Sequence, residues 1–435
     1  MKISYNFKKS KTVGFLTWLF VDGEKDLFKD SKLIGLLSRF NNSKLSMVCI
    51  GLSLACLWYE SLFTRLGVGW VEGFNLGAIF LLLALLFCDK QRLRSTRATV
   101  YLLLFVLSVI ISGLLAAING LEMGMIITGI MLLGQFVLAF IVASTYKSKL
   151  VFINVILLLS VPLLLVGVFQ GFWGDPTSKL WVSGVETLID ARAFGFFGSP
   201  NVMGSLIMIT SIMALFAFLD KKKWYYLVFE ILALIVIVLT FSRSAWLGLV
   251  VGVIIALLIK NWRMVLLAPL GLLALLIPSI RQRLFVSFSQ EYLVDAALDG
   301  RTWAFNNAIE IFKTSPILGT GPGSYGGQTA IYYNSPIYLR SMQSGYVALP
   351  YTDNQWLQVL AQIGVVGFIC VGGFFVSHFV NNLKQYKKSG SYLSLGIMAA
   401  VIAVIVNEIF SNIWEFGAIS VLSGAYLGLG NNYEI

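Results

Sequence analysis

Three arginines occur in segments rich in glycine, proline, asparagine or serine, each beside a long apolar run. The segments are ARAFGFFGSPN (191–201) with Arg192, LTFSRSAWLG (239–248) with Arg243, and DGRTWAF (299–305) with Arg301. Charge near the apolar interior of a membrane is costly, whereas guanidinium groups bind phosphate oxygens through charge-assisted, two-pronged hydrogen bonds. If these segments lie on one face of the protein, their chemistry is that of an anion site.

The first two segments each place an arginine near the predicted start of a helix. A helix that begins at Asn201 would present free backbone N–H groups to an anion beside Arg192, although the same glycines and proline are typical of an ordinary turn. Arg243 follows Ser242 and interrupts an apolar stretch over 231–259. A lone arginine there can also be a turn residue whose side chain reaches the water interface.

Arg301 begins a predicted helix over 301–313, which Asp299 could cap and Pro316 would end. An arginine in the first turn opposes the helix dipole unless an anion shares the site. The following segment, SPILGTGPGSYGG (315–327), is dense in glycine, as phosphate-cradling loops are. It lacks the Gly-Lys-Ser/Thr and the preceding strand of a Walker motif.

Acidic side chains supply the candidates for a general base. Asp353 and Asn354 precede the apolar part of YTDNQWLQVLAQIGVVG (351–367), where they could cap a helix. Asp353 could instead accept a proton from a sugar hydroxyl at the mouth of a cavity. Three further acids lie in or beside apolar runs and are candidates for arginine partners or for structural roles: Glu230, Glu408 and Glu415.

Metal and cofactor chemistry have little support in the residue types. The single histidine, His378, lies at the far end of an apolar run from the arginines, and the four cysteines have no metal-ligand spacing. We therefore expect neither a metal site nor a cofactor.

The elements that position these residues are predicted to be membrane-spanning helices. Of the 435 residues, 58% are hydrophobic and 12% are charged, whereas soluble domains carry about 25% charged residues. Twelve apolar runs of roughly spanning length occur, over 46–63, 71–88, 98–118, 123–145, 150–172, 201–219, 224–241, 244–259, 264–280, 355–380, 392–410 and 413–430. We expect an all-α integral membrane protein.

The connections between these runs are alternately rich and poor in lysine and arginine. One set of connections carries 23 of them and the other carries nine, among which are Arg192, Arg243 and Arg301. The positive-inside rule therefore places both termini in the cytoplasm and the three arginines on the outer face. It also explains the net charge of +11 without nucleic-acid binding.

The predicted organisation is one domain with an inserted outer subdomain. A cytoplasmic or interfacial segment covers 1–45, and spans 1 to 9 cover 46–280. An extracytoplasmic helical loop covers 281–354, and spans 10 to 12 cover 355–435. A loop of this length is usually functional.

The order of these motifs resembles that of the O-antigen ligase and Wzy-type polysaccharide polymerase superfamily. The resemblance covers about 190–370 and rests on GFFGSPN, LTFSRSAWLGL, GR-x-W, P-x-LG-x-G-x-G and DNQWLQVLAQIGVVG. It implies a metal-independent glycosyltransferase on the outer face of the bacterial cytoplasmic membrane, with undecaprenyl-diphosphate-linked glycans as donor and acceptor. A flippase, a chain-length regulator and membrane lipid are the partners it implies.

The resemblance also assigns roles. Arg192, Arg243 and Arg301 would hold the diphosphate, whereas the base stays unassigned by the resemblance and Asp353 is the best candidate for it. Substrate contacts would come from Asn201, Ser242, Trp303, Gly321, Tyr325, Tyr351 and Asn354. Ligases of the family carry a histidine in the outer loop, where this chain has Tyr351-Thr352-Asp353-Asn354, and many members have glutamate where this chain has Gln362. The missing histidine favours a polymerase of O-antigen, capsule or exopolysaccharide repeats.

Two alternatives remain at this stage. A ligase or protein O-oligosaccharyltransferase of the same superfamily would use the same donor. A transporter of lipid-linked sugars would also suit twelve spans, although the sequence has no inverted repeat and no paired broken helices.

Overall fold

The computed structural model describes residues 32–59, 70–174, 189, 191–263, 275–286, 289–290, 301–337 and 351–431, and every regular element within these ranges is a helix. The α-helices are α3 (Lys32–Leu37), α4 (Ser43–Trp58), α6 (Trp70–Phe87), α7 (Arg97–Ile118), α8 (Met123–Ser144), α9 (Lys149–Trp173), α10 (Pro200–Lys221), α11 (Trp224–Leu239), α12 (Arg243–Lys260), α13 (Pro278–Phe285), α15 (Arg301–Thr314), α16 (Gln328–Tyr332), α18 (Gln355–Ser389), α19 (Tyr392–Asn407) and α20 (Gly417–Leu429). Short 3-10 helices include η2 (Ser38–Phe40), η3 (Lys90–Arg92) and η7 (Ile413–Glu415).

The apolar helices confirm a helical membrane protein. Six of them, α7, α8, α9, α10, α12 and α18, are long and apolar enough to cross a bilayer, and α4, α6, α11, α19 and α20 are shorter apolar helices. These eleven helices coincide with eleven of the predicted runs. The remaining run, 264–280, lies mostly outside the described residues, so the count of twelve spans stays a prediction.

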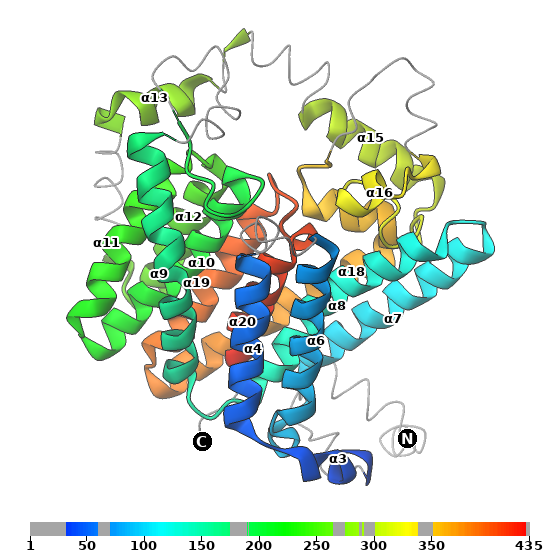
Figure 1. Cartoon of the computed structure of the whole chain (residues 1–435), viewed down its shortest axis with the longest axis horizontal. Coiled ribbons are helices and arrows are strands. Elements are labelled where there is room, and N and C mark those ends of the chain that lie inside the picture. Colours follow the sequence, from blue (N-terminus) through cyan, green and yellow to red (C-terminus); the bar gives the residue numbers. More distant parts are fainter. Residues whose placement is uncertain are drawn as a thin grey trace, which may run out of the picture.

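The helices form a bundle with distinct ends. Helix α3 lies at one end, and α13, α15 and α16 lie at the other (Figure 1). The C-terminal end of α20 is on the side of α3, because Asn431 hydrogen-bonds the segment before α7 through Arg94 and Thr96. The predicted outer-face segments that carry α13, α15 and α16 therefore lie at the end opposite to α3 (Figure 1). Which end faces the cytoplasm stays a prediction.

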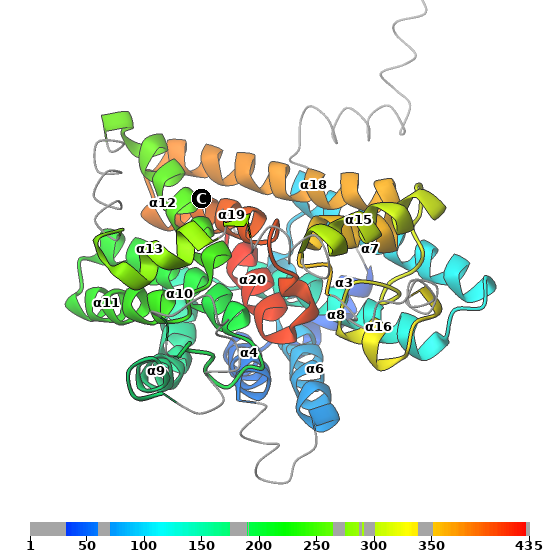
Figure 2. The same ribbon diagram turned by 90° about the horizontal axis from the view of Figure 1, so that it is seen from above.

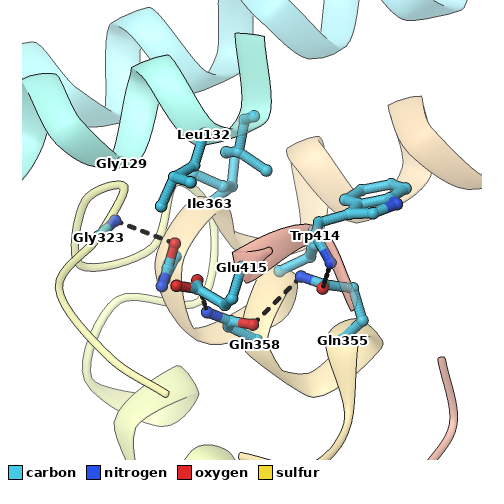
Figure 3. A pocket seen from close by; sticks show the side chains of 11 residues that line it. Gly129, Leu132, Gly323, Gln355, Gln358, Ile363, Trp414 and Glu415 are labelled. Carbon is cyan, nitrogen blue, oxygen red and sulfur yellow. Dashed lines mark hydrogen bonds between the residues drawn. The ribbon is translucent and has the colours of Figure 1, made fainter. Parts of the chain in front are cut away.

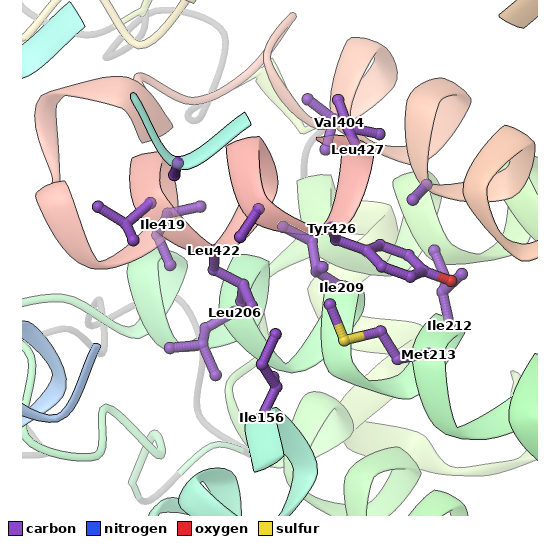
Figure 4. Close-up of a cluster of buried hydrophobic side chains, with 14 of the residues drawn as sticks. Ile156, Leu206, Ile209, Ile212, Met213, Val404, Ile419, Leu422, Tyr426 and Leu427 are labelled. Carbon is purple, nitrogen blue, oxygen red and sulfur yellow. The ribbon is translucent and has the colours of Figure 1, made fainter. Parts of the chain in front are cut away.

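Small residues let the central helices approach closely. A Cβ on Gly424 or Gly428 of α20 would overlap the backbone of α8, and Gly248 and Gly252 of α12 lie against the backbone of α19. Close backbone approach at small residues is a common way to pack helices in membranes. Around α20, side chains of α9, α10 and α19 complete an apolar core (Figure 4).

Helix α18 runs across the bundle (Figure 2) and is broken at Gly364, whose φ is 72° and ψ is −171°. The glycine-rich segment 315–327 fills this break with its own backbone. Thr320 N–H donates to Ala361 O and Gly321 N–H to Gln362 O, both at 2.9 Å. In return, the N–H of Val365 donates to Pro316 O at 2.9 Å. The outer segment is thereby joined to a membrane-spanning helix by main-chain bonds.

Candidate functional site

Helices α10 and α12 begin side by side at the end of the bundle opposite to α3 (Figure 1). Ser199 caps α10 by accepting from Asn201 N–H at 3.2 Å, and Pro200 occupies the first turn. Pro200 thus starts this helix and does not end a preceding one. A Cβ on Gly204 of α10 would lie 2.8 Å from the Cβ of Ser242, which precedes α12. The positive ends of two helix dipoles therefore lie close together.

Arg192 is held between these helix starts and is 5% exposed. Its Nε donates to Thr240 O at 2.8 Å, and its Nη2 donates to Phe241 O and to Asn201 Oδ1, each at 3.3 Å. Thr240 and Phe241 follow the end of α11, where backbone carbonyls carry the negative end of that helix dipole. The orientation of this guanidinium is therefore fixed by main-chain oxygens.

Arg243 and Arg283 join the same region. Arg243 is the first residue of α12, and its Nη1 donates to Arg283 O at 3.4 Å. Arg283 lies on α13, and its Nε donates at 3.1 Å to Phe241 O, the carbonyl that Arg192 also uses. Sequence reasoning counted Arg283 only as one of nine outer charges, because nothing in the sequence brings α13 against the turn between α11 and α12.

The electrostatics show that the predicted arginines converge. Burial, and then the positive charges of Arg243 and Arg301, lower the pKa of Arg192 to about 10. The positive charges of Arg243 and Arg301 are thus close enough to Arg192 to affect it. Like charges brought together near two helix N-termini disfavour one another, and an anion placed among them would be stabilised.

Arg301 reaches this region on α15, which packs on α18 through small residues. Ala304 and Ala308 are buried, and Tyr325 O–H donates to Ala304 O at 3.3 Å. The buried face of this helix runs through Ala304 and Ala308, whereas Ile309 is exposed. The helix ends at Thr314, close to the predicted stop, whereas the predicted cap Asp299 lies outside the described residues.

Asp353 forms an ion pair with Arg301, with Oδ2 3.1 Å from Nε. The two side chains are 40% and 28% exposed, so the pair faces the outside of the bundle. Asp353 has a φ of 51°, which is uncommon for a residue other than glycine but tolerated by aspartate. The sequence did not predict this contact, because the two residues are 52 positions apart and on different elements.

The neighbours of Asp353 have structural partners. Asn354 is the N-cap of α18, with Oδ1 accepting from Leu357 N–H at 2.9 Å, so the capping interpretation is right for Asn354 and not for Asp353. The hydroxyl of Tyr351 donates to Gln328 Oε1. Burial, and then the charges of Glu415 and Asp353, raise the pKa of Tyr351.

The remaining predicted substrate residues differ in position. Asn201 contacts Arg192, and the hydroxyl of Ser242 lies 3.3 Å from that of Ser244. Trp303 is half-buried in the first turn of α15. Gly321 and Tyr325 belong to the segment that fills the break in α18 and are buried there. The N–H of Gly321 donates to the protein, so this glycine-rich segment serves docking and not the phosphate-cradling alternative.

A polar cluster lies between α18 and the connection that carries Glu415 (Figure 3). Gln358 of α18 donates to the carboxylate of Glu415 and to Tyr325 O, and it accepts from Asn412. Gln362, at the position where many family members have glutamate, accepts from Gly323 N–H at 3.1 Å and donates to Tyr325 O. This pattern requires both a donor and an acceptor, which glutamine supplies and an ionised glutamate cannot. The adjoining cavity of about 10 Å³ is too small for a sugar.

No cluster of three metal-ligating side chains occurs among the described residues. His378 is fully buried against Phe140 and Phe374 and hydrogen-bonded to Asn382. The only histidine of the chain therefore has no part in the arginine region.

Comparison with known proteins agrees with the geometry. A family model described as O-antigen ligase matches residues 228–372, a range that contains Arg243, Arg283, Arg301 and Asp353. No curated protein matches the chain at a significant level. Over residues 228–372 the chain is therefore similar to the O-antigen ligase family, and this part carries most of the residues described above.

Proposed function

We propose that this protein polymerises oligosaccharide repeat units carried on a polyprenyl diphosphate, on the outer face of the bacterial cytoplasmic membrane, with both termini in the cytoplasm. The observation that carries the proposal is the position of Arg192 and Arg243 beside the starts of α10 and α12. Arg301 supports it, because its charge helps to lower the pKa of Arg192. A diphosphate carries the charge and the oxygen geometry that such a group of arginines binds.

The reaction needs little beyond charge stabilisation and orientation. A hydroxyl of one lipid-linked repeat attacks the anomeric carbon of the growing chain, and the bond from that carbon to the diphosphate oxygen breaks. The electron pair leaves with the polyprenyl diphosphate, whose added negative charge the arginines stabilise. The hydroxyl proton goes to a base, and the glycan becomes one repeat longer.

Asp353 is the best placed base. Its ion pair with Arg301 uses Oδ2, so within the described residues Oδ1 remains to accept from the attacking hydroxyl. In this arrangement Arg301 would contact both the leaving diphosphate and the carboxylate that receives the proton. One residue would then set the distance between the donor and the acceptor.

A ligase is the second candidate, since the matching family model is described as O-antigen ligase. A ligase would pass the finished glycan to a different acceptor. We favour the polymerase because Tyr351, Thr352, Asp353 and Asn354 stand where ligases of the resembling family carry a histidine, and His378 is buried elsewhere. A flippase and a chain-length regulator would be partners of the polymerase.

The test is turnover by the purified protein in detergent, with the lipid-linked single repeat as the only substrate and no membrane gradient. We expect a ladder of longer lipid-linked glycans together with free polyprenyl diphosphate. A ligase would give a product only after a second acceptor is added. A third outcome is a folded protein that binds the lipid-linked repeat but converts it neither alone nor with the second acceptor. That result would favour a transporter and contradict the proposal.

A further inference from the structure

Glu415 is a half-buried glutamate whose carboxylate the proposed reaction does not use. It ends η7, in the connection between α19 and α20, and one of its oxygens accepts from Gln358 of α18 (Figure 3). Burial raises its pKa to about 7, an effect that outweighs the amide of Gln358 and the nearby backbone amides of Gln328 and Thr329. Burying such a group is costly, so its contacts need an explanation.

The carboxylate lies against the turn that begins α16. Gly327 has no room for a side chain, because a Cβ there would overlap the carboxylate of Glu415. Oε2 has no hydrogen bond of good geometry among the described residues. The backbone amides of Gln328 and Thr329 are nevertheless close enough to the carboxylate to lower its pKa. Glu415 therefore sits between α18 on one side and the turn at Gly326–Gln328 on the other.

The turn at Gly326–Gln328 also contacts the segment 351–353, which carries Asp353. Gly326 O accepts from Thr352 N–H and from Asn412 Nδ2, each at 3.1 Å. Thr352 is fully buried. A Cβ on Gly326, whose φ is 79°, would overlap the hydroxyl of Thr352. On the other side, Tyr351 hydrogen-bonds Gln328. Residues 351–353 are thus held by the same turn that Glu415 holds.

We propose that Glu415 is a positioning residue for the acceptor side of the site. It fixes the turn at Gly326–Gln328 to Gln358, and this turn sets the backbone from which Asp353 meets Arg301. The proposal rests on the proposed function for its effect on catalysis, but its effect on the backbone can be measured without any substrate.

The test uses two variants that weaken the contact between the carboxylate of Glu415 and the turn at Gly326–Gln328. One changes Glu415 and the other changes the turn. Glu415→Gln places amide hydrogens against the backbone amides of Gln328 and Thr329, and Gly327→Ala forces the carboxylate away. Glu408→Gln is the control, since Glu408 is a buried glutamate in the same connection whose side-chain oxygens have no hydrogen-bond partner in the described part of the chain.

Three quantities are measured in each full-length variant and compared with the wild-type protein. We expect hydrogen exchange at the Thr352 amide to be about tenfold faster in both variants, which corresponds to losing one hydrogen bond to a charged group. Extension of the lipid-linked repeat should slow by about the same factor. The dissociation constant for undecaprenyl diphosphate should change by less than about twofold, because the arginine contacts are intact. The control should change none of the three.

Unchanged exchange at Thr352 in both variants would overturn the proposal, even if extension slowed. A parallel weakening of undecaprenyl diphosphate binding and of melting temperature would mean that Glu415 only stabilises the fold. If the wild-type protein does not extend the repeat, the proposed function fails, and the exchange measurement alone decides whether Glu415 holds the backbone. Should Glu415→Gln fail to fold, Gly327→Ala gives the same comparison.

Discussion

The two halves of the candidate site hold their arginines in different ways. Arg192 is buried, and main-chain carbonyls of Thr240 and Phe241 fix its guanidinium. Arg301 is partly exposed and is fixed by a side chain, the carboxylate of Asp353. A group held by backbone oxygens cannot move without moving its helices. A group held by one half-exposed ion pair can exchange that partner for a ligand at little cost, because such pairs contribute only about 0–1 kcal/mol.

This difference suggests a division of labour. The region around α10, α12 and α13 would provide a preformed site for the diphosphate. The region around α15 and α18 would provide an adjustable contact between the diphosphate and the acceptor. Preformed donors stabilise developing charge without reorganisation during the reaction, so the largest losses should follow changes in the first region.

Arg192→Lys should cause the largest loss. A lysine is a point charge and cannot donate to Thr240 O, Phe241 O and Asn201 Oδ1 with the same planar geometry. We expect the extension rate to fall about 10²–10³-fold, as for loss of one preformed donor, with a lower melting temperature. Arg281→Lys is the control, because Arg281 is exposed on α13. A near-normal extension rate with Arg192→Lys would contradict a preformed diphosphate site around α10, α12 and α13.

Asp353→Asn should separate the two roles of the ion pair. If Asp353 is the base, the extension rate falls about 10²–10⁴-fold, while the dissociation constant for undecaprenyl diphosphate changes little. Arg301→Ala should weaken that binding as well as the rate. The base role would be contradicted if both substitutions weakened binding equally and Asp353→Asn had little effect on the rate at saturating substrate. Asp353 would then only orient Arg301.

Arg283→Ala tests whether the preformed region extends to α13. Arg283 shares Phe241 O with Arg192 and its own carbonyl accepts from Arg243. We expect about a tenfold loss in extension, equivalent to about 1.4 kcal/mol, measured beside Arg281→Ala. A loss as large as that of Arg192→Lys would make Arg283 an equal member of the site.

The smallest effect concerns pH. The folded protein lowers the pKa of Arg192 to about 10 from 12.5, so burying its charge costs stability at neutral pH. That cost is relieved as the pH rises through about 10, because the folded state releases the proton before the unfolded state does. A bound diphosphate favours the charged form. The increase in melting temperature that undecaprenyl diphosphate produces should therefore shrink between pH 9 and about 10.5; a constant increase would mean that Arg192 does not face the ligand.

Local signals were enough to predict the helices. The predicted start of α10 at Asn201 lies one residue from the observed start at Pro200, and Asn354 caps α18 as the sequence indicates. The predicted end of α18 is too early, because the helix continues past residue 380 to Ser389. The three arginines could be predicted to share one face because lysine and arginine alternate between connections. These features depend on neighbours in the sequence or on one global rule.

The contacts that assemble the site could not be predicted in this way. The break in α18 at Gly364 is visible only as a glycine, and its partner segment at Pro316–Gly321 lies more than forty residues earlier in the chain. Glu415 read as part of a span over 413–430, but α20 begins at Gly417 and leaves this carboxylate in a short turn. Each of these features depends on a long-range pairing of backbone groups, which no local pattern encodes.

The central claim is that arginines from both halves bind one diphosphate. The most direct measurement is the dissociation constant of the purified protein for undecaprenyl diphosphate in the wild type, Arg192→Ala, Arg301→Ala and the double variant. We predict that each single change weakens binding by about tenfold or more, and that the double change costs less than the sum, because both groups contact one ligand. Fully additive losses would place the two arginines at separate sites, and an unchanged dissociation constant in either single variant would contradict the account.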